Sequence, residues 1–208
     1  INNFGFKFAK GDYIMLLNND VELITPDIFQ SMLGFCMRPE VGIVGAKLLY
    51  NDHTVQHAGV LVGAGGLADH VFKGIHEDDP GYMGRAISSQ DVSAVTAACL
   101  LVKRSVYEEV GGLEDEFQVA FNDVDFCLKV RKAGYLIVYN PYAELYHYES
   151  KSRGMEDTPE KQLRFSREVN CFRRKWEREL LKGDPYYNPN LTLNNTDCSL
   201  RKQEKNGD

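Results

Sequence analysis

The chain has 208 residues, of which 43% are hydrophobic and 26% are charged, as in an ordinary globular domain. This length leaves room for one hydrophobic core and a tail. The formal net charge of −6 argues against a nucleic-acid-binding surface. No apolar run reaches the roughly 18 residues that a membrane-spanning helix needs.

The first informative segment is residues 11–20, GDYIMLLNND. Its apolar run, 14–17, predicts a strand that is covered on both faces of a mostly parallel sheet. Asn18, Asn19 and Asp20 follow directly, where ligands bind in open α/β sheets. Asp20 is well placed to hold a hard divalent cation, and through it substrate phosphates. A plain strand-to-loop corner, for which Asn and Asp are common, explains the same residues without a ligand.

Helical and strand patterns alternate through the middle of the chain. The expected elements are a helix over 25–37, strands over 41–49 and 55–62, a loop over 67–90, a strand over 97–102 and a helix over 105–110. Thr25-Pro26 supplies a cap and a first helical proline, and Gly111-Gly112 ends the short helix. The loop holds several Asp, Glu and His residues, but their spacing fits no known ligand pattern, so we predict a mobile loop.

A second polar cluster opens a helix over 122–134. Asn122 is predicted as its N-cap, and Asp123 and Asp125 fall in the first turn. There they could simply favour the helix dipole, by about 0.3–1 kcal/mol. Two short strands then lead to His147, and a lone histidine is more often a half-buried ring than a ligand.

The remainder of the chain predicts a long amphipathic helix over 158–181 and then a change in composition. Residues 183–208 are rich in Asn, Pro, Asp and Lys, which predicts a poorly ordered tail behind a domain over 1–182. The five cysteines are scattered and odd in number. Buried thiols in a reducing cytoplasm explain them better than disulfides or zinc.

Four segments, taken in order, resemble the motifs of the inverting, GT-A type glycosyltransferases of family 2. They are AKGDYIMLLNND over 9–20, AACLLVKRSVYEEVGGLEDEF over 97–117, the helix over 122–134, and AELYH over 143–147. Each motif is weak alone, but the ordered set is specific. The resemblance implies an α/β fold, a partial GT-A domain with a mixed Rossmann-like sheet flanked by helices. At ~30 residues per βαβ unit, it places roughly 80–100 residues of nucleotide-binding units before Ile1, so activity of this chain alone is expected to be incomplete.

The resemblance also implies roles for individual residues. Asp20 resembles the last acid of the family's D-x-D motif, which binds the metal on the donor diphosphate, and Asn18 stands where the first acid would be. Asp123 matches the general base, which takes the proton of the acceptor hydroxyl. His147 matches a late histidine that completes the metal site. Asn122 replaces the more usual Glu, so Asp123 has no acidic neighbour there.

The implied activity is metal-dependent transfer of a hexosyl or rhamnosyl group, with Mn or Mg, from a nucleotide-diphosphate sugar to a glycan or lipid-linked saccharide. Arg153 could pair with the diphosphate, or be a solvated loop charge. We expect a cytoplasmic protein, or one at the inner face of the membrane, and a homo-oligomer formed through an exposed sheet edge. The alternative is a non-catalytic carbohydrate-binding or assembly module. Convergence of Asp20, Asp123 and His147 on one cleft would favour the transferase.

Overall fold

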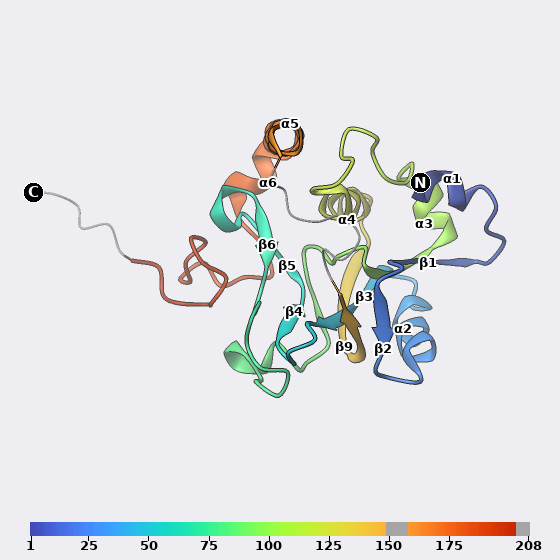
Figure 1. Ribbon diagram of the computed structural model, residues 1–208, viewed down its shortest axis with the longest axis horizontal. Helices are drawn as coiled ribbons and strands as arrows, with labels where there is room; N and C mark the ends of the chain where they lie inside the picture. The colour runs from blue at the N-terminus through green and yellow to red at the C-terminus, as the bar shows by residue number, and fades with distance from the viewer. Residues whose placement is uncertain (149–157, 203–208) are drawn as a thin grey trace, which may run out of the picture.

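The structure is a computed structural model that describes residues 1–148 and 158–202. A seven-stranded mixed sheet forms its centre, with the main order β1-β8-β3-β9-β2, while β4 pairs with β3 and β7 with β9. Figure 1 labels five of these strands, β1, β2, β3, β4 and β9. These strands are β1 (Tyr13–Leu17), β2 (Val21–Leu23), β3 (Val41–Leu49), β4 (Val55–His57), β7 (Gln90–Asp91), β8 (Cys99–Lys103) and β9 (Leu136–His147). The predicted mixed sheet is confirmed.

The expectation of a mostly parallel sheet around the first strand is wrong. β3 and β9 run parallel, but β1 pairs antiparallel with β8 and ends the sheet path. Its side chains therefore alternate: Ile14 and Leu16 are buried, whereas Leu17 is exposed. A continuous apolar run does not distinguish a central parallel strand from an antiparallel strand at the sheet end. Association of two copies through this edge stays a prediction.

Helices cover both faces of the sheet, as predicted. α2 (Ile28–Cys36) buries Ile28, Met32 and Cys36, which recur every four residues, against one face. α3 (Arg104–Glu109) and α4 (Asn122–Lys132) cover the other face, and in Figure 1 α5 lies beyond α4. Successive residues of β3 point to opposite faces, so Ile43 and Val44 belong to different core clusters.

Several predicted elements are divided differently in the structure. The strand predicted over 55–62 is interrupted at Gly59, whose φ of 103° is in the left-handed region. β5 (Val60–Val62) then forms a separate two-stranded sheet with β6 (Ala68–His70). The helix predicted over 158–181 is interrupted at Trp176 into α5 (Pro159–Lys175) and α6 (Glu177–Lys182). The short segments α1 (Asn2–Phe6), η1 (Ala64–Gly66) and η2 (Tyr82–Gly84) complete the described elements.

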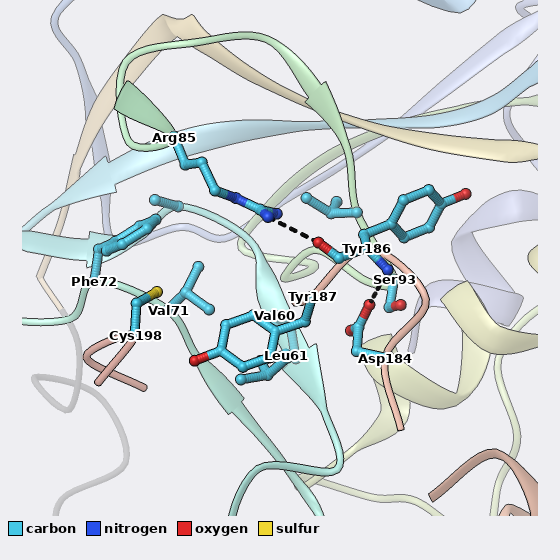
Figure 2. A pocket seen from close by; sticks show the side chains of 12 residues that line it. Val60, Leu61, Val71, Phe72, Arg85, Ser93, Asp184, Tyr186, Tyr187 and Cys198 are labelled. Carbon is cyan, nitrogen blue, oxygen red and sulfur yellow. Dashed lines mark hydrogen bonds between the residues drawn. The ribbon is translucent and has the colours of Figure 1, made fainter. Parts of the chain in front are cut away.

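The prediction of a poorly ordered tail is wrong for residues 183–202, which pack on the domain. Leu191 and Cys198 are buried in the core, and Asp184 Oδ2 accepts a 3.0 Å hydrogen bond from Val62 N. Figure 2 shows Arg85 reaching Tyr186, to whose carbonyl oxygen it donates at 2.8 Å, beside a small pocket. Polar composition misled the prediction because a few buried side chains anchor a segment whose Asn and Asp residues make its turns.

Two expectations about environment can be compared with the structure. In the part of the chain that it describes, no helix combines the length and apolarity needed to cross a membrane. All five cysteines are free, and all except Cys171 are buried. Burial raises the pKa of the Cys36 thiol to about 11 and that of Cys99 to about 12, so both stay protonated at neutral pH.

Candidate active site

Asp20 and His147 lie together because of strand register. Asp20 precedes β2, and the first residue of that strand, Val21, pairs with His147 at the end of β9. The Asp20 Oδ1 atom lies 3.3 Å from His147 Nε2. This oxygen is buried, yet it makes no hydrogen bond with any described residue. An orphaned carboxylate oxygen beside an imidazole nitrogen is unusual, since buried polar atoms are nearly always paired.

Asn18 approaches the same imidazole nitrogen. Its Nδ2 atom lies 3.1 Å from His147 Nε2, and its backbone N–H donates a 3.0 Å hydrogen bond to the Ala98 carbonyl. The end of β1 therefore brings Asn18 and Asp20 to one side of His147. These three predicted residues form one polar group, which we call the Asp20 cluster.

Asp123 occupies the first turn of α4, as predicted, but Asn122 is not the N-cap. That position is taken by Phe121, with a φ of 62°, and the Asn122 side chain donates to the Val119 carbonyl at 3.2 Å. Asp123 Oδ1 accepts from Val124 N at 2.8 Å, and Oδ2 accepts from Ala97 N at 3.2 Å.

The two parts of the candidate site are connected through residues 97–98. Ala97 donates to Asp123, and the next residue, Ala98, accepts from the Asn18 backbone. Asn18 and Asp123, 105 positions apart in sequence, are thus joined by one dipeptide. Arg153, the fourth candidate for donor binding, lies outside the described residues.

Two buried residues that the sequence did not single out lie next to the site. The Gln56 side chain contacts Nδ1 of His147. The His57 ring lies with Nε2 3.4 Å from Thr96 N and with Nδ1 2.9 Å from Nδ1 of His70. Burial is the main cause that holds the pKa of His57 well below its usual value, and the nearby His70 and His147 lower this pKa further. His57 is therefore neutral at pH 7. The sequence signal that could have identified Gln56 and His57 is that both are polar residues within a strand that is otherwise apolar and buried.

The Asp20 cluster fits a divalent cation, although its protein ligands are few. Among the residues that the structure describes, no group of three or more His, Cys, Asp and Glu could hold a metal. Neighbouring oxygen ligands of an octahedral Mg²⁺ lie about 3 Å apart, close to the 3.3 Å between Asp20 Oδ1 and His147 Nε2. Such ions are commonly held by one or two carboxylates together with substrate phosphates. The pair is thus suited to an ion shared with a phosphate-bearing ligand.

Solved structures share this architecture. A mannosyltransferase from Pyrobaculum calidifontis, in complex with GDP-Man and Mn²⁺, superposes with a TM-score of 0.52 at 14% identity, over 86% of this chain and 43% of that one. GalNAc-T7 with UDP, GalNAc and Mn²⁺ gives 0.56 at 11% identity, over 81% and 33%. The chain has the GT-A glycosyltransferase fold. At these identities the likeness concerns the fold alone.

Sequence relatives are much longer than this chain, and no protein-family model matches it. An uncharacterized protein of Sinorhizobium fredii, y4gI, is 51% identical over 96% of the chain and 22% of its own length. The O-antigen biosynthesis protein RfbC of Myxococcus xanthus is 39% identical over 100% of the chain and 16% of its own length. An N-acetylglucosaminyl-diphospho-decaprenol L-rhamnosyltransferase of Mycobacterium tuberculosis is 38% identical over 33% of the chain and 22% of its own length. The chain therefore spans about a fifth of these curated relatives.

Proposed function

We propose that this chain is the acceptor-side part of a family 2 glycosyltransferase, which transfers a hexosyl or rhamnosyl group with inversion. The donor would be a nucleotide-diphosphate sugar and the acceptor a glycan or lipid-linked saccharide in polysaccharide biosynthesis. The names of RfbC and of the rhamnosyltransferase support this class of reaction. The observation that carries the proposal is the orphaned Asp20 oxygen facing His147.

Asp20 and His147 would hold a divalent cation, with the Asn18 amide beside them. When bound, such an ion supplies positive charge that offsets the charge growing on the departing diphosphate. The chain's own contribution is to keep the two side chains together through the pairing of β2 with β9. It also keeps the Asp20 carboxylate largely out of water, since 18% of this side chain is exposed. Its charge is therefore less screened than at an open surface.

Asp123 would act as the general base. As the acceptor oxygen forms its bond to the anomeric carbon, the bond from that carbon to the diphosphate oxygen breaks and the hydroxyl proton passes to Asp123. Each carboxylate oxygen has two lone pairs, and each oxygen of Asp123 accepts one backbone N–H in the structure. These two hydrogen bonds fix the carboxylate while leaving it capacity to receive the acceptor hydroxyl.

A non-catalytic carbohydrate-binding or assembly module remains the alternative. It is favoured by the same two hydrogen bonds, because a carboxylate that accepts Val124 N and Ala97 N could serve only to cap α4 and anchor the strand before β8. In that case the Asp20 cluster would bind a ligand without turnover.

Metal-dependent nucleotide binding tests the donor half of the proposal. Calorimetric titration of the chain with UDP, GDP and dTDP, with and without Mn²⁺, should show binding that needs the metal. Asp20→Asn should abolish it, whereas Asp12→Asn, an exposed acid before the start of β1, should not. Nucleotide binding that persists unchanged in Asp20→Asn would remove Asp20 from the metal site.

Turnover tests Asp123 in the protein that contains this chain. Asp123→Asn should lower kcat by at least about 10²-fold, the usual minimum for general-base catalysis, with donor affinity unchanged. The exposed Asp115→Asn is the matched control. Sugar transfer at the normal rate in Asp123→Asn would exclude this residue as the base. Binding of a saccharide without any turnover in the unmodified protein would favour the alternative.

A further inference from the structure

Gln56 is the extra residue of a β-bulge next to the Asp20 cluster. In the pairing of β3 with β4, Leu48 lies opposite His57 and Leu49 opposite Val55, so Gln56 is the extra residue on β4 between these two pairs. Bulges commonly re-aim a side chain beside an active site. Here the re-aimed side chain is 4% exposed and contacts His147, at the end of β9, which pairs with the other edge of β3. The bulge thus places a buried amide against the imidazole.

The Gln56 amide contacts both the side chain and the backbone of His147. Its Oε1 atom lies 2.6 Å from His147 Nδ1, and its Nε2 atom donates a 3.3 Å hydrogen bond to the His147 carbonyl. These two contacts decide the orientation of the amide, because the reversed amide would set two acceptors against each other at the carbonyl.

This orientation decides which nitrogen of His147 carries a proton. Oε1 can only accept, so Nδ1 must be the donor. In the neutral ring Nε2 then holds the lone pair, and Nε2 is the atom that faces Asp20 Oδ1 at 3.3 Å and Asn18 Nδ2 at 3.1 Å. The lone pair needed by a cation is thus directed to where the orphaned carboxylate oxygen lies.

We propose that Gln56 is the positioning residue that prepares His147 as a metal ligand, by fixing its tautomer and ring orientation. This inference rests on the proposed metal role of Asp20 and His147. Outer partners of ligating histidines typically change metal affinity by about 10–100-fold when they are removed. A purely structural Gln56 would instead affect folding stability and leave the affinity for the ion unchanged.

Two readouts test this role. Gln56→Met keeps the side-chain length without either hydrogen bond, Gln56→Glu keeps an acceptor for Nδ1, and Gln30→Met on the exposed face of α2 is the control. Free Mn²⁺ measured by electron paramagnetic resonance, with and without GDP or UDP, gives the affinity. We expect Gln56→Met to weaken Mn²⁺ binding by about 10–100-fold. Gln56→Glu and Gln30→Met should stay within a few-fold of the unmodified chain.

The second readout does not depend on metal. ¹⁵N spectra of the chain labelled at histidine should show His147 as the Nδ1–H tautomer. The His147 signal is the one that disappears in His147→Gln. Gln56→Met should shift the tautomer equilibrium of His147 toward Nε2–H. An Nε2–H tautomer in the unmodified chain, or unchanged Mn²⁺ affinity in a folded Gln56→Met, would overturn the role of Gln56 alone. Absence of Mn²⁺ binding in the unmodified chain would overturn the proposed metal site, and the inference with it.

Discussion

Trp176 Nε1 donates a 2.8 Å hydrogen bond to Oδ1 of Asp125, a side chain with no solvent exposure. Lys175 Nζ lies 2.7 Å from the same oxygen. Asp125 therefore joins α4 to the end of α5, whereas Asp123, two residues earlier, is only partly buried and contacts residue 97 beside the Asp20 cluster. Residues two positions apart point to different sides of a helix, so the two acids have different surroundings.

This difference predicts opposite outcomes for two similar substitutions. Asp125→Ala should lower the free energy of unfolding by about 1–3 kcal/mol, because Trp176 Nε1 loses its acceptor in a buried position. Asp123→Ala should cost less, because Asp123 is only partly buried and water can replace its carboxylate at Val124 N and Ala97 N. Urea denaturation measures both. Equal losses in the two variants would contradict the view that Asp125 is the more important of the two acids for stability.

The sequence predicted the elements better than it predicted their surroundings. Local patterns were enough for β3, α2 and α4, since β3 is a nine-residue, mostly apolar stretch and the two helices have helical apolar spacing and recognisable ends. They could not separate Asp123 from Asp125, because both are acids in the first turn of one helix. The bulge at Gln56 and the contact of His57 with His70 depend on how separate strands pair and pack together. Such contacts leave no trace in local periodicity.

Gly45, in the middle of β3, is required by the packing of its neighbour. A Cβ atom at this position would lie 2.4 Å from Val95 Cβ and 2.5 Å from its Cγ1. Val95 is fully buried, so Gly45→Ala should destabilise the domain by about 1–3 kcal/mol. Gly34→Ala in α2, where the added Cβ meets nothing within 4 Å, should be neutral or stabilising by up to about 1 kcal/mol.

A double substitution checks the cause of the Gly45 effect. If the clash is responsible, Val95→Ala should make room, and the loss from Gly45→Ala should be smaller in that background than alone. Thermal or chemical denaturation of the four chains in this cycle gives the coupling. Strictly additive losses would show that contact with Val95 does not limit this position.

His57 should make stability depend on pH below neutrality. Its pKa is held well below 6.5 in the folded chain, chiefly by burial, so the unfolded chain binds a proton that the folded chain does not. Stability from this group is complete above about pH 6.5 and decreases as pH falls toward the folded pKa, by up to about 1.4 kcal/mol per pH unit. His57→Gln cannot titrate, so its unfolding free energy should decrease less between pH 7.5 and 5.5. Identical slopes would contradict the burial of a neutral His57.

Glu168 holds the segment that leads into α4. Its side chain is 3% exposed, and its oxygens accept three successive backbone N–H groups, from Gln118 at 3.0 Å, Val119 at 3.3 Å and Ala120 at 2.8 Å. Phe121, in a left-handed conformation, and then Asn122 and Asp123 follow at once. A single carboxylate on α5 thus fixes the backbone just before the proposed base.

Glu168→Gln should release this segment, because the amide nitrogen would face backbone donors in place of an acceptor oxygen. Each N–H left without a partner costs about 1–3 kcal/mol, so hydrogen exchange at residues 118–120 should accelerate by about tenfold or more. Exchange in the middle of β3 should change less. Glu160→Gln, an exposed acid in the first turn of α5, is the matched control and should leave the exchange of residues 118–120 unchanged. Unaltered protection of those three amides in Glu168→Gln would show that another contact holds the segment.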